Sequence, residues 1–307
     1  MVNMPNSSIL AQIRTIVPAD DLMCDEPMSR HTSFQVGGRA AYFIRISEHT
    51  QIMRLIALFR EQEMDFFILG NGSNVLVGDK GYPGAILHVG AGMSKINVQD
   101  NEILAEAGAS LSAVAALAAV SGLSGMEFAA GIPGTVGGAI VMNAGAFEGE
   151  MAAVVKFVSV FNGAGSLMEL DNRAMEFGYR TSIIRKSQHI VISATLRLRH
   201  GDPSQIQQKM TELAQKRRIR QPLEYASAGS TFKRPDGHYA GKLIMETGLR
   251  GFSVGSAQVS DKHCGFIINK GSATATDIST LIHMVRERVH AHSGILLEPE
   301  VIFLGDF

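Results

Sequence analysis

The segment that most restricts the fold of this chain is residues 131–147, with the sequence GIPGTVGGAIVMNAGAF. Five of these seventeen residues are glycine and one is proline, and small or apolar side chains fill most of the other positions. Glycine permits positive φ and lets another group approach the backbone closely, at an entropic cost to the unfolded chain. A single glycine is explained well enough by a tight turn. The whole run, with Asn143 and Gly145 near its end, instead predicts that bare main chain faces a ligand.

A second glycine-rich segment, Gly70-Asn71-Gly72-Ser73-Asn74, directly follows the apolar run at 66–69, which we expect to be a buried strand. Backbone amides that follow a strand can cradle a phosphate group. The segment is not a Walker loop, because no Gly-Lys-Ser/Thr follows. It is not a Rossmann fingerprint either, because Val75 takes the place of the third glycine. Two such segments can hold the two ends of an extended dinucleotide, and a pair of structural turns is the alternative.

Composition narrows the kinds of partner. The 307 residues are enough for two or three subdomains, and 46% apolar against 19% charged residues is typical of a globular protein with a sizeable core. A net charge of −1 gives no sign of a nucleic-acid or membrane surface, so a small-molecule partner is expected. The two cysteines make no disulfide framework, and the N-terminus does not read as a signal peptide. We therefore expect a cytoplasmic protein without membrane insertion, and no metal, because His263 and Cys264 lack a spaced ligand cluster.

Apolar periodicity at the start of the chain predicts a small α/β lobe. Apolar residues recur at helical spacing near 9–16 and 52–59, and strand-like runs stand at 41–46 and 66–69. The order of strand, helix and strand is typical of an α/β unit.

From residue 75 onward the pattern changes to short strands separated by turns. Ser110 is a suitable N-cap for a helix, and Gly122 stands where that helix should end. Further elements are expected as a charged helix at about 204–219, a short helix at 240–247, a strand at 265–269, a helix with apolar residues from Ile278 to Val289 that ends at Gly294, and a terminal strand. We expect four regions, namely 1–74, 75–200, 201–296 and a terminal strand at 297–307 that returns to the active site.

Several segments match one enzyme family, in family order and over nearly the whole chain. They are TSFQVGG (32–38), LGNGSNVLV (69–77), GMEFAAGIPGTVGGAIVMNAGAF (125–147), FGYRTSII (177–184), RRIRQPLEYASAGSTFKRP (217–235), GKLI (241–244), VSDKHCGFIIN (259–269) and EPEV (298–301). Together they resemble the UDP-N-acetylenolpyruvoylglucosamine reductases, flavoenzymes that make UDP-N-acetylmuramate for bacterial peptidoglycan. The chain is similar to the shorter subtype, because it has no long insertion near residue 190.

The resemblance implies an α+β fold. A two-lobed FAD-binding domain of the vanillyl-alcohol-oxidase type would be joined to an α/β substrate-binding C-terminal domain. It also implies non-covalent FAD, with NADPH as the reductant. The residues expected to contact FAD are Gly70, Asn71, Gly72, Ser73, Asn74, Gly131, Ile132, Pro133, Gly134, Gly137, Gly138, Asn143 and Gly145.

The resemblance also assigns three catalytic residues. Hydride from flavin N5 goes to the outer vinyl carbon of UDP-N-acetylglucosamine enolpyruvate. Ser230 matches the family's proton donor, while Arg180 and Glu300 match the pair that stabilises the enol-like intermediate. Without the motifs, Ser230 would be explained as a turn serine, Arg180 as a surface arginine and Glu300 as a solvated acid.

Arg217, Lys233 and Arg234 are the candidates for the UDP diphosphate, because arginine matches phosphate oxygens in geometry. A solvated helix end is the alternative for the first of these. Lys242 and His263 stand in matching segments, without an assigned role. Two departures concern substrate contacts: Phe147 stands where relatives often have Tyr, and Ile302 where some have a second basic residue.

Other readings of the sequence stay open. One is a different FAD-dependent oxidase of the same fold that acts on an alcohol or sugar. Another is a nucleotide-sugar sensor without catalysis. The sequence does not define the oligomeric state or the choice between NADPH and NADH.

Overall fold

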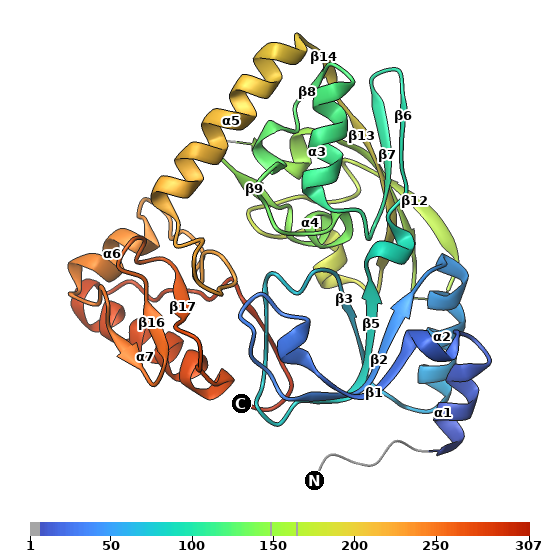
Figure 1. Ribbon diagram of the computed structural model, residues 1–307, viewed down its shortest axis with the longest axis horizontal. Helices are drawn as coiled ribbons and strands as arrows, with labels where there is room; N and C mark the ends of the chain where they lie inside the picture. Colours follow the sequence, from blue (N-terminus) through green and yellow to red (C-terminus); the bar gives the residue numbers. More distant parts are fainter. Residues whose placement is uncertain (1–6, 148, 164) are drawn as a thin grey trace.

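The computed structural model describes residues 7–147, 149–163 and 165–307. Figure 1 shows a first lobe (blue), a second lobe (green to yellow) stacked on it, and a C-terminal domain (orange to red) beside both. No helix in these described ranges is both long and apolar enough to cross a lipid bilayer.

The first lobe is a four-stranded sheet in the order β1-β2-β5-β3. Its elements are α1 (Ser7–Arg14), β1 (Leu22–Pro27), β2 (Arg39–Ile46), α2 (His49–Glu61), β3 (Phe66–Leu69) and β5 (Tyr82–Val89). Strand β5 lies parallel to both β2 and β3 and between them. The sheet therefore crosses the boundary expected at residue 74, because its central strand comes after the glycine-rich loop.

Apolar residues cover both faces of this sheet. Ile13 of α1 and Leu55 of α2 are buried in one core with Ile44 of β2. On the opposite face, Phe43 and Ile86 pack with Leu304 from the end of the chain. The parallel strands β2, β5 and β3 are mostly apolar because both faces of this part of the sheet are covered, as is usual for parallel strands.

The second lobe is a five-stranded antiparallel sheet in the order β12-β11-β13-β7-β6. Its strands are β6 (Ile96–Gln99), β7 (Glu102–Glu106), β11 (Val155–Phe161), β12 (Leu167–Asp171) and β13 (Ile190–Arg197). Two helices, α3 (Leu111–Val120) and α4 (Val136–Met142), share its core. The predicted cap is confirmed: Ser110 Oγ accepts a hydrogen bond from Ala113 N at 3.2 Å, and Gly122 follows the helix with φ +66°.

The short pairs β8 (Leu123–Ser124) with β14 (Arg199–His200) and β9 (Gly145–Ala146) with β10 (Gly149–Glu150) complete this lobe. Asp202 caps the N-terminus of helix α5 (Pro203–Arg220), and its carboxylate accepts a hydrogen bond from Ser204 N at 2.8 Å. It packs against α3 and the 3-10 turn Glu127–Ala129. This helix therefore lies on the second lobe, although the sequence groups it with the third region.

The C-terminal domain is a three-stranded sheet covered by helices. Its elements are α6 (Ala240–Glu246), β15 (Ser253–Val254), β16 (Ala257–Val259), β17 (Ile267–Asn269) and α7 (Ala275–Ser293). Helix α7 ends at Gly294, as predicted, with φ +73°. The core of this domain includes Phe34 and Leu76 of the first lobe, and Asp79 of that lobe accepts a hydrogen bond from Ala275 N, in the first turn of α7, at 2.8 Å. The first lobe and the C-terminal domain thus share one apolar core.

The last strand, β18 (Ile302–Leu304), pairs in parallel with β4 (Val75–Val77). Strand β4 directly follows the first glycine-rich loop. The end of the chain therefore returns to that loop, and this brings the EPEV segment to the middle of the molecule.

Candidate functional site

The two glycine-rich loops, 70–74 and 131–138, lie side by side between the lobes, although about sixty residues separate them in sequence. A Cβ atom at Gly70 would lie 2.4 Å from Thr135 Oγ1, and one at Gly134 would lie 3.8 Å from Ser73 Oγ. The loops therefore form one continuous surface, which we call the cofactor loops.

Part of this surface is open main chain. Gly138, in the first turn of α4, is exposed, and a Cβ there would have only Thr135 Oγ1, at 3.6 Å, within contact distance. Gly134 meets its neighbours at ordinary van der Waals distances. Gly137 is different: it is buried, and a Cβ there would lie 3.0 Å from Ala107 Cβ. Gly134 and Gly138 thus leave the backbone sterically accessible to a ligand, whereas glycine at 137 is required by packing.

Two other glycines are also explained by the protein itself. A Cβ at Gly72, where φ is +60°, would lie 1.9 Å from the carbonyl oxygen of His31. A Cβ at Gly145 would lie 2.5 Å from the carbonyl oxygen of Gly149. These positions require glycine whether or not a ligand is bound.

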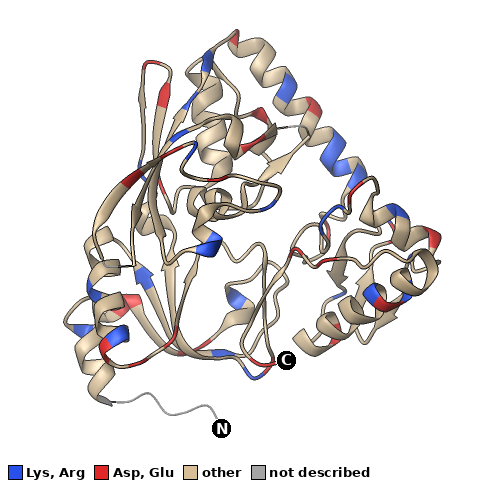
Figure 2. Ribbon diagram, turned by 180° about the vertical axis from the view of Figure 1, so that it is seen from behind, with Lys and Arg blue, Asp and Glu red and all other residues tan. Residues whose placement is uncertain are grey.

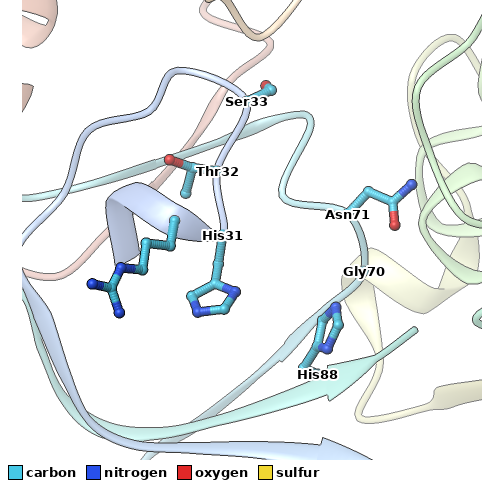
Figure 3. Close-up of a pocket in the computed structure, with 7 residues that line it drawn as sticks. His31, Thr32, Ser33, Gly70, Asn71 and His88 are labelled. Carbon is cyan, nitrogen blue, oxygen red and sulfur yellow. The ribbon is translucent and has the colours of Figure 1, made fainter. Parts of the chain in front are cut away.

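A cavity of about 270 Å³ adjoins the cofactor loops on the first lobe. It is lined by Arg30, His31, Thr32, Ser33, Gly70, Asn71 and His88. Figure 3 shows the rings of His31 and His88 beside the loop that carries Gly70 and Asn71. Burial, then the nearby His31, lowers the pKa of His88 to about 4, so this ring is neutral near pH 7.

Ser33 Oγ in the same cavity is buried and has no hydrogen-bond partner among the residues that the structure describes. An unpaired buried hydroxyl costs free energy, so it is suited to a polar ligand. Together with the sterically open backbone at Gly134 and Gly138, this hydroxyl fits a dinucleotide such as FAD.

The predicted catalytic residues meet in a second cleft, of about 440 Å³, between the second lobe and the C-terminal domain. Arg180, Ser230 and Glu300 all line it. Arg180 Nε lies 3.0 Å from Glu300 Oε1, and these side chains are only 20% and 16% exposed. Arg180 Nη2 donates to the carbonyl oxygen of Gly145 at 2.9 Å. Three residues from distant parts of the chain thus face one space.

Backbone hydrogen bonds hold the segments of Ser230 and Glu300 together. Glu300 N donates to the carbonyl oxygen of Thr231 at 2.8 Å. The carbonyl oxygen of Glu300 accepts from Asn74 Nδ2 at 3.1 Å. Asn74 is the last residue of the first cofactor loop, so this loop directly supports the backbone of the carboxylate.

Arg180 stands in a tight turn with φ +55°, in the left-handed region that costs a non-glycine residue free energy. Asn143 holds this turn. Its Nδ2 donates to the carbonyl oxygen of Gly178 at 3.0 Å, and its Oδ1 accepts from Ala152 N at 2.9 Å. Asn143 is 0% exposed and caps α4 with φ 42°, a conformation that asparagine tolerates. Its side chain therefore serves the arginine turn, and its predicted contact with the cofactor stays a prediction.

The cleft is strongly cationic. Its charged lining residues are Arg180, Arg234, Lys242, Arg250, Lys262 and Glu300. Burial raises the pKa of Glu300, and the adjacent Arg180 opposes that rise. Such a lining favours an anionic ligand.

Sequence reasoning assigns no role to several residues of this lining, among them Tyr179, Arg250 and Lys262. The hydroxyl of Tyr179 accepts a hydrogen bond from Arg234 N at 3.1 Å, which joins the second lobe to the C-terminal domain. Tyr179 and Lys262 stand in segments that match the family, 177–184 and 259–269, and this was the available signal, whereas Arg250 stands in none of the matching segments.

The three residues predicted to bind the diphosphate of UDP have different surroundings in the structure. Arg234 lines the cleft and stacks on Tyr239, with its Cζ 3.9 Å from the ring centroid. Lys233 Nζ is bonded to the Glu298 carboxylate. Arg217 lies outside the cleft's lining, near the last turn of α5, where Figure 2 shows a cluster of Lys and Arg.

Arg217 lies against the second cofactor loop. A Cβ at Gly131 would be 2.7 Å from Arg217 Nη1, and Arg217 Cζ is 5.9 Å from the Phe147 ring centroid. Its Nε is buried without a hydrogen-bond partner among the described residues, and burial lowers its pKa. A buried guanidinium with an unused donor is suited to an anion. The predicted contact of Arg217 with the diphosphate agrees with this environment and stays a prediction.

Comparison with known proteins gives the family. Residues 40–171 match the model of an FAD binding domain, and residues 221–304 match the model of the UDP-N-acetylenolpyruvoylglucosamine reductase C-terminal domain. The chain is 45% identical to UDP-N-acetylenolpyruvoylglucosamine reductase from Clostridioides difficile (strain 630), over 99% of this chain and 100% of the relative. The chain belongs to the UDP-N-acetylenolpyruvoylglucosamine reductase family.

Two further comparisons agree with this membership. The UDP-N-acetylenolpyruvoylglucosamine reductase of Agathobacter rectalis is 48% identical, over 98% of this chain and 100% of that relative. The crystal structure of UDP-N-acetylenolpyruvylglucosamine reductase (MurB) from Thermus caldophilus superposes with a TM-score of 0.80 at 33% identity, covering 92% of this chain and 98% of that one. The predicted α+β fold, with an FAD-binding domain and a reductase C-terminal domain, is confirmed. The chain is an oxidoreductase of this family, and FAD is its cofactor.

Proposed function

We propose that this protein reduces UDP-N-acetylglucosamine enolpyruvate to UDP-N-acetylmuramate in the cytoplasm, with NADPH as the reductant. The observation that carries the proposal is the cleft itself, in which Arg180, Glu300 and Ser230 converge beside cationic walls. When bound, FAD carries hydride from NADPH to the outer vinyl carbon of the substrate.

We expect the cofactor loops to bind FAD. The accessible backbone near Gly134 and the unpaired hydroxyl of Ser33 supply neutral polar groups suited to an extended phosphorylated ligand, while Gly138 N donates to Thr135 Oγ1 and leaves its side of the loop sterically open. The two free cysteines, Cys24 and Cys264, agree with the reducing compartment that we propose.

Arg180 acts on the charge that develops beside the substrate carboxylate. Glu300 fixes the Nε edge of the guanidinium, and Gly145 fixes Nη2. Nη1 has no hydrogen-bond partner among the described residues, so it is the donor that would bind the enol-like oxygen. A planar, permanent cation held in advance stabilises such charge without reorganisation.

Ser230 supplies the proton for the inner carbon. Its Oγ gives up the proton as that carbon accepts it, and the resulting alkoxide regains a proton from water. A serine hydroxyl is a weak acid, so the step needs a nearby positive field. The cations that line the cleft provide such a field.

Product analysis tests the proposal. The purified holoprotein is incubated with NADPH and UDP-N-acetylglucosamine enolpyruvate, and the sugar nucleotide is analysed by mass spectrometry. We expect conversion to UDP-N-acetylmuramate, a gain of two hydrogens, with one NADPH consumed for each product. NADPH oxidation that is independent of the sugar nucleotide would indicate a different oxidase. Tight binding of the sugar nucleotide without NADPH oxidation would indicate a sensor.

A further inference from the structure

His263 is a part-buried titratable side chain in the catalytic cleft that the proposed reaction does not use. It stands in the turn between β16 and β17, on the C-terminal domain. The turn joins the segment of the proposed proton donor, because Thr231 N donates to the carbonyl oxygen of Gly265 at 2.8 Å and Ser230 pairs with Phe266. The ring and Ser230 are therefore carried by two segments that are bonded directly to each other.

The hydrogen bonding of the ring fixes its tautomer. Gly265 N donates to His263 Nδ1 at 3.1 Å, so Nδ1 is an acceptor and the ring proton is on Nε2. Burial lowers the pKa of His263, although a hydrogen bond to its own backbone opposes this shift, so the site favours the neutral ring. The ring thus has a single N–H donor, at Nε2.

Packing fixes the orientation of the ring as well. The ring is edge-on to Phe266, with centroids 5.0 Å apart and planes at 68°. A Cβ atom at Gly265 would lie 3.0 Å from His263 Cε1, and one at Gly241 would lie 3.4 Å from it. Both glycines therefore leave just enough room for the ring on its Nδ1 side.

The Nε2 donor has no hydrogen-bond partner in the part of the chain that the structure describes. A polar group that lines a ligand cleft, with its other nitrogen and its ring plane already fixed, is prepared to bind a ligand acceptor. We propose that His263 Nε2 donates a hydrogen bond to an acceptor oxygen of the sugar nucleotide. This inference rests on the proposed function, since the ligand that reaches Ser230 in that reaction is the enolpyruvyl sugar nucleotide.

Two amide substitutions distinguish the contribution of Nδ1 from that of Nε2. His263→Asn keeps an acceptor near Nδ1 for Gly265 N and removes the distal donor. His263→Gln puts an amide N–H near the place of Nε2. We expect His263→Asn to raise the KM for UDP-N-acetylglucosamine enolpyruvate about tenfold, as the loss of one hydrogen bond implies. His263→Gln should recover most of that affinity.

Other readouts isolate the effect. The flavin absorbance spectrum and the rate of flavin reduction by NADPH alone should match those of the unmodified protein in both variants. His283→Asn, on an exposed position of α7, is the matched control and should leave the KM unchanged.

Three outcomes would overturn the inference. The first is an unchanged KM in His263→Asn. The second is a KM that is raised as much in His263→Gln as in His263→Asn, because the amide N–H near the place of Nε2 would then fail to restore the contact. In the third, the unmodified protein fails to turn over the enolpyruvyl sugar nucleotide, and this alone would also overturn the proposed function.

Discussion

Arg180 Nε lies 3.0 Å from Glu300 Oε1, although 120 positions separate these residues in the sequence. The pair is mostly buried and joins the second lobe to the segment before β18. Breaking a buried pair by removing one partner leaves the other charge uncompensated. The contact therefore both joins two sides of the cleft and orients the arginine.

The raised pKa of Glu300 predicts a pH dependence. Burial favours the protonated carboxyl, so this group takes up its proton at a higher pH than an ordinary glutamate, while Arg180 limits the shift. As the pH falls through that raised pKa, the ion pair with Arg180 is lost and kcat should fall. Glu300→Gln should be slower at neutral pH and should lack this acidic limb. The measurement is the pH profile of kcat, and an acidic limb that persists in Glu300→Gln would assign it to another group.

Removing the Ser230 hydroxyl should separate the two halves of the reaction. In Ser230→Ala, reduction of FAD by NADPH should keep its rate, while turnover of the enolpyruvyl sugar nucleotide should fall about 100-fold or more, the range of general acid catalysis. Rapid-mixing absorbance measures each half. Ser227→Ala, three residues earlier, is the control. Turnover at the unmodified rate in Ser230→Ala would remove this serine from the proposed role.

Two asparagines in glycine-rich segments should behave differently. Asn143 is buried and bonded to Gly178 and Ala152, so Asn143→Ala removes two part-buried hydrogen bonds, takes the acceptor away from Ala152 N and places alanine at a strained φ of 42°. We expect it to lower the free energy of unfolding by about 2–4 kcal/mol. It should also slow the sugar-nucleotide half of the reaction through the Arg180 turn.

The exposed Asn71 is the contrasting position. Asn71→Ala should change the unfolding free energy by less than about 0.5 kcal/mol and weaken FAD binding. Denaturation of the apoprotein and FAD titration measure the two effects. Equal stability losses in Asn71→Ala and Asn143→Ala would contradict this distinction.

Arg217 is suited to an anion because its Nε is buried and unpaired among the described residues. Arg217→Ala should raise the KM for the sugar nucleotide far more than it slows flavin reduction by NADPH. Arg218→Ala, on the exposed side of the same helical turn, should change neither. Equal effects of Arg217→Ala on both quantities would count against a substrate phosphate contact and would favour one with the cofactor loop at Gly131.

Local signals predict several elements well. The apolar run 66–69 is β3, and Ser110 caps α3, because strand composition and side-chain capping act within a few residues. The insertion of β5 between β2 and β3 is not predictable in this way, because sheet order depends on distant contacts.

The same holds for the candidate site. The sequence names Arg180 and Glu300 through motifs, and only the fold brings their side chains into contact. Arg250 stands in no matching motif, so its place in the cleft depends on the packing of the C-terminal domain. The distinction between Asn71 and Asn143 likewise depends on burial, which two similar glycine-rich contexts do not reveal.

The most direct test is a two-step absorbance measurement on the unmodified holoprotein without oxygen. Adding NADPH should bleach the flavin absorbance. Adding UDP-N-acetylglucosamine enolpyruvate should then restore it, with UDP-N-acetylmuramate as the product. A flavin that bleaches but stays colourless after the sugar nucleotide is added would contradict the account.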